Sequence, residues 1–113
     1  MAESKLRDLS MDFSVKVIKL CENIKGHYSL VNQLECSATS IGANINEAVY
    51  GNSKADFISK LHIALKEAGE SIYWLKLLKN TQLVDYDFES LLSLAEEIKR
   101  MLIASLNTAK ENK

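Results

Sequence analysis

The 113-residue sequence contains no proline, only four glycines and two cysteines. Because proline interrupts helices, its absence beside 47% hydrophobic and 26% charged residues is typical of a folded, mostly helical protein and argues against a disordered chain. A chain of this length is expected to form one domain, which spans residues 1–113. The composition therefore favours an all-α fold.

Long apolar runs are missing as well. No segment approaches the ~18 apolar residues that a membrane span needs, and the first ten residues are charged rather than apolar as in a signal peptide. We therefore expect a cytoplasmic protein with no membrane partner. Cys21 and Cys36 show neither CxxC spacing nor a paired histidine motif, which predicts reduced, packed thiols.

Residues 37–56, which read SATSIGANINEAVYGNSKAD, form the most distinctive segment. Small and uncharged polar residues lie here on a helical apolar frame, which breaks at Gly51 and Asn52. The chain restarts at Ser53, with Asp56 three positions later, in the form of an N-cap. A helix that faces water normally carries Lys, Glu or Arg on its outer positions, so this helix is expected to be covered on more than one side.

Apolar residues recur at spacings of three and four along the chain, which predicts helices at about residues 6–25, 30–50, 53–80 and 86–109. Asp85 is expected to cap the last of them. Short connections favour antiparallel neighbours, so the simplest fold is an antiparallel up-down-up-down four-helix bundle. The predicted core comprises Phe13, Leu20, Leu34, Ile41, Ile45, Phe57, Leu61, Leu65, Ile72, Leu75, Leu92, Ile98 and Leu102.

Motifs for catalysis or metal binding do not occur. The Glu-x-x-His motif of di-iron bundles is missing, and His27 and His62 have no ligand-forming neighbours at helical spacing. The glycines are too far apart for a phosphate loop, and no thiol or hydroxyl is paired with a base. Glu47, Glu67 and Glu70 are conceivable acids or bases, but paired or solvated helix carboxylates are far commoner. We expect no enzyme activity, metal or cofactor.

The charge balance bears on nucleic-acid binding. Fourteen Lys and Arg against fifteen Asp and Glu leave a net charge of −1 and a pI near 6.1, whereas nucleic-acid-binding domains usually carry a basic excess. Two lysine pairs are candidates for small basic patches, although ordinary solvated lysines are the commoner case. These candidate nucleic-acid contacts are Lys16, Lys19, Lys76 and Lys79.

Two predicted helices carry a second apolar strip, which one bundle core has no room to bury. The first helix adds Met11, Val15 and Ile18 to its inner stripe, and the third has aromatic and aliphatic residues opposite its own. Such exposed strips usually mark interfaces, so we expect a homo-oligomer. The alternative is that these residues thicken the monomer core or stay singly exposed. The candidate oligomer interface comprises Ile63, Tyr73, Trp74, Leu77, Gly42, Asn44 and Glu47.

Within this set, Asn44 and Glu47 are expected to be buried polar groups that set helix register or subunit geometry. The alternative is that they satisfy a helix end or a loop amide. Subunit number does not follow from the strips alone.

Three segments carry a resemblance to a known family: TSIGANINEA at residues 39–48, SKADFI at residues 53–58, and IALKEA at residues 63–68, with Trp74 and Leu75 after it. From residue 9 to residue 109 the sequence resembles the bacterial four-helix bundle proteins related to the 23S rRNA intervening-sequence protein. The pattern S-I-x-x-N-I-x-E-A with a downstream D/E-F-I is fairly specific as a combination.

The resemblance implies an antiparallel bundle that assembles into a ring-like homopentamer and has no catalytic residues. Some relatives are encoded inside inserts of the 23S rRNA gene, and a similar bundle is the accessory protein of diversity-generating retroelements, where it contacts a reverse transcriptase and nucleic acid. Two functions are therefore hypotheses: an assembly or scaffold protein with a protein partner, and an RNA-binding protein associated with rRNA inserts or a reverse transcriptase. The near-neutral charge favours the first.

Overall fold

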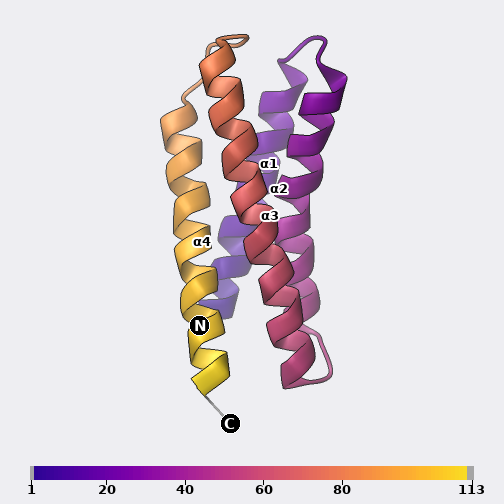
Figure 1. Cartoon of the computed structure of the whole chain (residues 1–113), viewed down its shortest axis with the longest axis vertical. Coiled ribbons are helices and arrows are strands. Elements are labelled where there is room, and N and C mark those ends of the chain that lie inside the picture. Colours follow the sequence, from indigo (N-terminus) through magenta and orange to yellow (C-terminus); the bar gives the residue numbers. More distant parts are fainter. Residues whose placement is uncertain (1, 112–113) are drawn as a thin grey trace.

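The computed structural model describes residues 2–111, which form four long helices lying side by side (Figure 1). These are α1 (Ala2–Glu22), α2 (Tyr28–Val49), α3 (Lys54–Thr81) and α4 (Phe88–Glu111). α2 packs on α1 and α3, and α4 packs on α3 and α1, so the helices follow one another around the bundle in chain order. Each helix runs opposite to the one before it (Figure 1). The expected up-down-up-down, all-α bundle is confirmed.

α1 differs most from its predicted bounds, because it starts at Ala2 and ends at Glu22. The apolar pattern continues past the helix end, since Ile24 is buried although it lies outside the helix. The chain leaves the helix through a tightened turn, in which the backbone N–H of Asn23 donates to Leu20 O at 3.0 Å. Gly26 and His27 then both adopt positive φ, at 76° and 52°, which turns the chain toward α2.

The starts of α3 and α4 test two predicted caps. Ser53 caps α3 as expected, because its side chain accepts a hydrogen bond from the backbone N–H of Asp56 at 3.0 Å. The prediction that Asp85 caps α4 is wrong. Instead, Asp87 Oδ1 accepts from the backbone N–H of Ser90 at 3.1 Å, and the helix starts at Phe88. The N-cap bond needs an N–H two or three residues ahead, which Asp87 has at the true helix start.

The core lies along the bundle axis and contains nearly all the residues that the periodicity predicts. Phe57 and Leu65 are the exceptions, because both are half-buried at the edge of the core. The core is made mainly of aliphatic side chains, together with Cys21, Phe88 and the fully buried Phe13. Each helix therefore buries one apolar stripe in the core, and any further apolar strip remains on the outside of the single chain.

The two free cysteines have different environments. Cys21 is buried, as expected, but Cys36 is exposed on α2, so the prediction of a packed thiol is wrong there. Burial and, to a smaller extent, the nearby Glu35 carboxylate raise the pKa of the Cys21 thiol to about 12. Cys21 is therefore a protonated core thiol at neutral pH.

No helix within residues 2–111 is long and apolar enough to cross a membrane.

Candidate interaction surfaces

α1 and α2 approach each other closely at Gly42. A Cβ placed on Gly42 would lie 3.3 Å from Ser10 Oγ, which is tighter than ordinary van der Waals contact. The neighbouring hydroxyls are satisfied within the helix pair: Ser10 Oγ donates to Arg7 O at 3.0 Å, and Ser14 Oγ donates to Ala38 O of α2 at 3.3 Å. Small residues on both helices thus bring the two backbones together along this seam.

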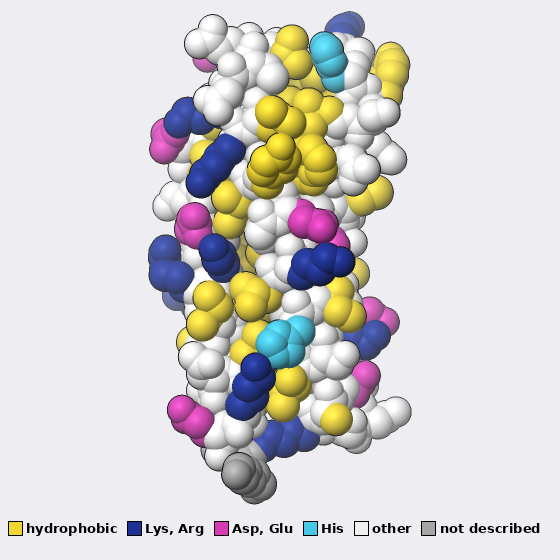
Figure 2. Space-filling model, viewed as in Figure 1, with side chains coloured by type: hydrophobic (Ala, Val, Ile, Leu, Met, Phe, Trp, Pro, Cys, Tyr) yellow, Lys and Arg dark blue, Asp and Glu magenta, His cyan; other side chains and the backbone are white. Residues whose placement is uncertain are grey.

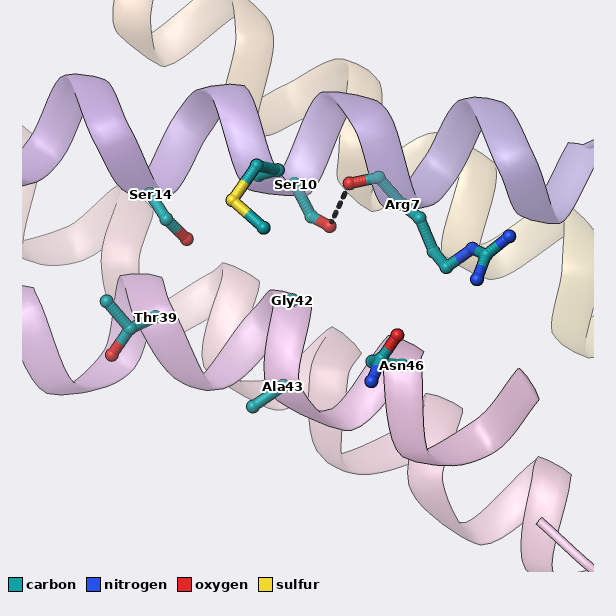
Figure 3. Close-up of a pocket in the computed structure, with 8 residues that line it drawn as sticks. Arg7, Ser10, Ser14, Thr39, Gly42, Ala43 and Asn46 are labelled. Carbon is teal, nitrogen blue, oxygen red and sulfur yellow. Dashed lines mark hydrogen bonds between the residues drawn. The ribbon is translucent and has the colours of Figure 1, made fainter. Parts of the chain in front are cut away.

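A pocket of about 300 Å³ opens along the seam between α1 and α2 (Figure 3). Its walls are Arg7, Ser10, Met11 and Ser14 from α1, and Thr39, Gly42, Ala43 and Asn46 from α2. Arg7 is the one ionisable residue among them. The lining is otherwise small or uncharged, so the pocket is suited to receive side chains from another molecule rather than to hold an ion.

The Arg7 side chain lies at one end of this pocket (Figure 3). Its Nη1 donates to the Tyr50 hydroxyl at 3.1 Å, and the guanidinium carbon lies 5.7 Å from the centroid of the Tyr50 ring. Its Nε is buried and has no hydrogen-bond partner among the residues that the structure describes. Such unpaired buried donors are uncommon, and each needs an explanation.

Exposed apolar side chains surround the pocket on the outside of α1. Met11 is 66% exposed, and Val15 and Ile18 follow it on the same side of the helix. We call this area the α1–α2 surface, defined as the pocket lining together with Val15 and Ile18.

A second exposed apolar area follows the outer side of α3. Tyr73 is 59% exposed, and Ile63 and Leu77 are also exposed. Trp74 is different, because it is half-buried and packs against the core. The Tyr73 and Trp74 rings meet edge to face, with centroids 5.1 Å apart. Figure 2 shows hydrophobic side chains gathered over the upper half of this face.

Two carboxylates lie along the same helix between Ile63 and the aromatic pair. Burial raises the pKa of Glu67, and the Glu70 carboxylate raises it further, while Lys66 acts in the opposite direction. Neither glutamate takes part in an ion pair within the described residues. The α3 surface is defined here as Ile63, Glu67, Glu70, Tyr73, Trp74 and Leu77.

The family model of the 23S rRNA-intervening sequence protein matches residues 2–104. The chain belongs to the 23S rRNA-intervening sequence protein family. It is also similar to the crystal structure, at 1.70 Å, of a protein of unknown function from the S23 ribosomal protein family of Bacteroides thetaiotaomicron VPI-5482. The two share 39% sequence identity with a TM-score of 0.87, over 95% of this chain and 99% of that chain. A search of the curated proteins found no match.

In this member of the 23S rRNA-intervening sequence protein family, the three α2 candidates do not share one side of the helix. Gly42 faces α1, as its contact with Ser10 shows. Asn44 is half-buried, and its Nδ2 donates to Ser40 O of the same helix at 2.8 Å. Glu47 is exposed, so the prediction that it is a buried polar group is wrong for the single chain.

The buried polar contact between α2 and α3 was not predicted. Ser71 Oγ donates to Ser37 Oγ at 2.9 Å, and Ser37 Oγ donates to Leu34 O at 3.2 Å. Both serines are buried, so this short chain of hydrogen bonds sets the register of the two helices. Serine on the inner side of a helical wheel is the sequence signal that identifies such a contact.

The four candidate lysines of this family member do not form one patch. They are divided between α1 and α3, which do not pack on each other. Lys16 Nζ lies 3.0 Å from Asp12 Oδ2, and Lys79 pairs with Glu89, while Lys19 and Lys76 are exposed. An ion pair reduces the charge that a lysine offers to a phosphate.

The described part of the chain contains no group of three or more His, Cys, Asp or Glu that could hold a metal ion. His27 and His62 are both exposed, at different places in the fold.

Proposed function

We propose that this member of the 23S rRNA-intervening sequence protein family is a cytoplasmic, non-enzymatic homo-oligomer, with five copies preferred, that serves as an assembly or scaffold for a protein partner. The observation that carries the proposal is the presence of two separate exposed apolar surfaces on one small bundle. The family resemblance supports the number five.

The composition of the two surfaces supports the proposal. Oligomer interfaces are enriched in Tyr, Trp, Met and Arg, and depleted in Lys. The α3 surface has Tyr73 and Trp74, and the α1–α2 surface has Met11 and Arg7. Leaving such residues in water would favour nonspecific association, so a defined partner surface is the simpler explanation.

Native mass spectrometry of the full chain at micromolar concentration tests the proposal. We expect one closed oligomer, at five times the 12.7 kDa mass of the chain. A defined oligomer of another size would correct the number of copies and leave the scaffold role in place. A monomer would overturn the proposal.

The alternative function, RNA binding, leads to a prediction of its own. In a titration against structured RNA we expect no saturable binding at low salt, because the net charge is −1 and the candidate lysines are dispersed. Saturable binding that falls steeply as salt rises would contradict this and favour the alternative. Lys19→Glu combined with Lys76→Glu is the matched control, because both side chains are exposed and their loss should weaken any true phosphate contact.

A further inference from the structure

We infer that the α1–α2 surface of one copy packs against the α3 surface of the next copy, so that one contact between unlike surfaces is repeated around the oligomer. The inference rests on the proposed function and names the two surfaces that would form its interface. It starts from the position of each surface along the bundle.

Two contacts align the helices. Ser10 of α1 lies against Gly42 of α2, and Ser37 of α2 is bonded to Ser71 of α3. Counting residues from these contacts at 1.5 Å per residue gives every position a height along the bundle, measured from Gly42.

On this scale the two surfaces match. Ile18 and Trp74 both lie ~12 Å above Gly42, and Arg7 and Ile63 both lie ~4.5 Å below it. Glu67 lies ~1.5 Å above Gly42, close to the level of the small-residue pocket. In a ring whose axis is parallel to the bundle, surfaces at equal heights meet, so the aliphatic end of one surface faces the aromatic end of the other.

The polar groups of the two surfaces are also complementary. Arg7 is the cation of the α1–α2 surface. Glu67 and Glu70 lie together on the α3 surface with Lys66 beside them, and neither carboxylate forms an ion pair within the described chain. A second copy would bring the Arg7 guanidinium beside the Glu67 carboxylate, within reach of two long side chains. Two copies of the α1–α2 surface would instead bring two arginines together.

The placement of the surfaces favours a ring over a filament. They lie on adjoining sides of the bundle with α2 between them: one lies along the α1–α2 seam, and the other borders α2, because Gln33 shares a pocket with Tyr73 and Trp74. The outward directions of adjoining sides of a four-helix bundle differ by about a right angle. Each contact between unlike surfaces therefore rotates the next copy by roughly that angle, and the ring closes after ~4–5 copies.

This geometry places α2 on the inside of the ring and α4, which is diagonally opposite, on the outside. The polarity of the two helices agrees with the placement. Glu47 is the only charged residue among the exposed positions of α2, which otherwise include Asn32, Thr39, Ala43 and Asn46. Exposed positions of α4 include Glu89, Arg100 and Lys110, as expected for a helix in contact with bulk water.

Mixing two surface variants tests the inference. One variant carries Met11→Glu and Val15→Glu, and the other carries Ile63→Glu and Tyr73→Glu; all four side chains are exposed in the single chain. Each variant alone is expected to be monomeric by native mass spectrometry. An equimolar mixture should form a dimer with one copy of each variant and nothing larger, because only one intact contact is left between them.

Each other outcome is decisive. A variant that still dimerises by itself, or a mixture that stays monomeric while the wild type assembles, would overturn the inference and leave the proposed oligomer in place. A monomeric wild type would overturn the proposed function and the inference together. Circular dichroism confirms that each variant keeps its helices.

A charge exchange provides a second test if a double variant fails to fold. Arg7→Glu and Glu67→Arg should each weaken association at least about tenfold, as expected for a close interfacial charge pair. Both changes in one chain should restore association, because each contact then pairs Arg with Glu again. Failure to restore it would overturn the pairing.

Discussion

Leu102→Ala is expected to lower the free energy of unfolding by about 2–5 kcal/mol, because the change removes fully buried methyl groups and leaves a cavity. The matched control is the next residue, Ile103, which is 40% exposed on the outer side of α4. Ile103→Ala removes a side chain of the same size but should cost less than ~1 kcal/mol. Urea unfolding followed by circular dichroism, at one fixed chain concentration, measures both values.

This comparison tests the orientation of α4. Helical neighbours differ by about 100° around the axis, so the two substitutions probe different sides of one helix at the same height. Equal losses of stability would contradict the packing of α4 described above. A larger loss for Ile103→Ala would mean that α4 is rotated, with its outer side covered.

The fold could be predicted because each helix repeats its apolar positions over several turns. Leu102 was assigned to the core from that repeat alone, and the structure confirms it. Helix ends depend on single residues and were less predictable. Ile24 continues the apolar repeat beyond α1 because it packs on the core from the loop, and Asp87 rather than Asp85 makes the capping bond.

The α3 surface was partly predictable from sequence, since a helical wheel places Tyr73 and Leu77 away from the core, where the structure shows them exposed. The half-burial of Trp74 was not predictable, because it depends on how the indole packs against the core of the assembled bundle. Arg7 was missed for a similar reason. Its position becomes notable only when α1 and α2 are paired and its Nε is buried without a partner.

The low charge of α2 has a physical explanation in the structure. Gly42 brings one side of the helix against α1, and Ser37 fixes the other side against α3. Among the exposed positions of α2, Glu47 is the only charged residue, although the single chain leaves all of them open to solvent. A helix that is covered on both flanks and carries a single charge on its outer side fits an enclosed position in an assembly better than contact with bulk water.

Tyr73→Glu is expected to convert the oligomer to monomer while leaving the helix content unchanged. Tyr73 is 59% exposed in the single chain, so a carboxylate there costs the monomer little, but it would place an unpaired charge in the interface. Loss of a central aromatic contact typically weakens association about 30-fold or more. Native mass spectrometry and circular dichroism on the same sample measure the two effects.

Trp74→Glu should also release monomer, but it should lower thermal stability as well, because the half-buried indole packs against the core. Ile103→Glu is the matched control: it adds the same charge at an exposed apolar position on α4, outside both surfaces, and should leave the oligomer intact. If the Tyr73→Glu protein keeps the oligomer mass of the wild type, Tyr73 does not lie in the interface. Dissociation by Ile103→Glu would instead place α4 in the contact, which is incompatible with an α4 that faces outward.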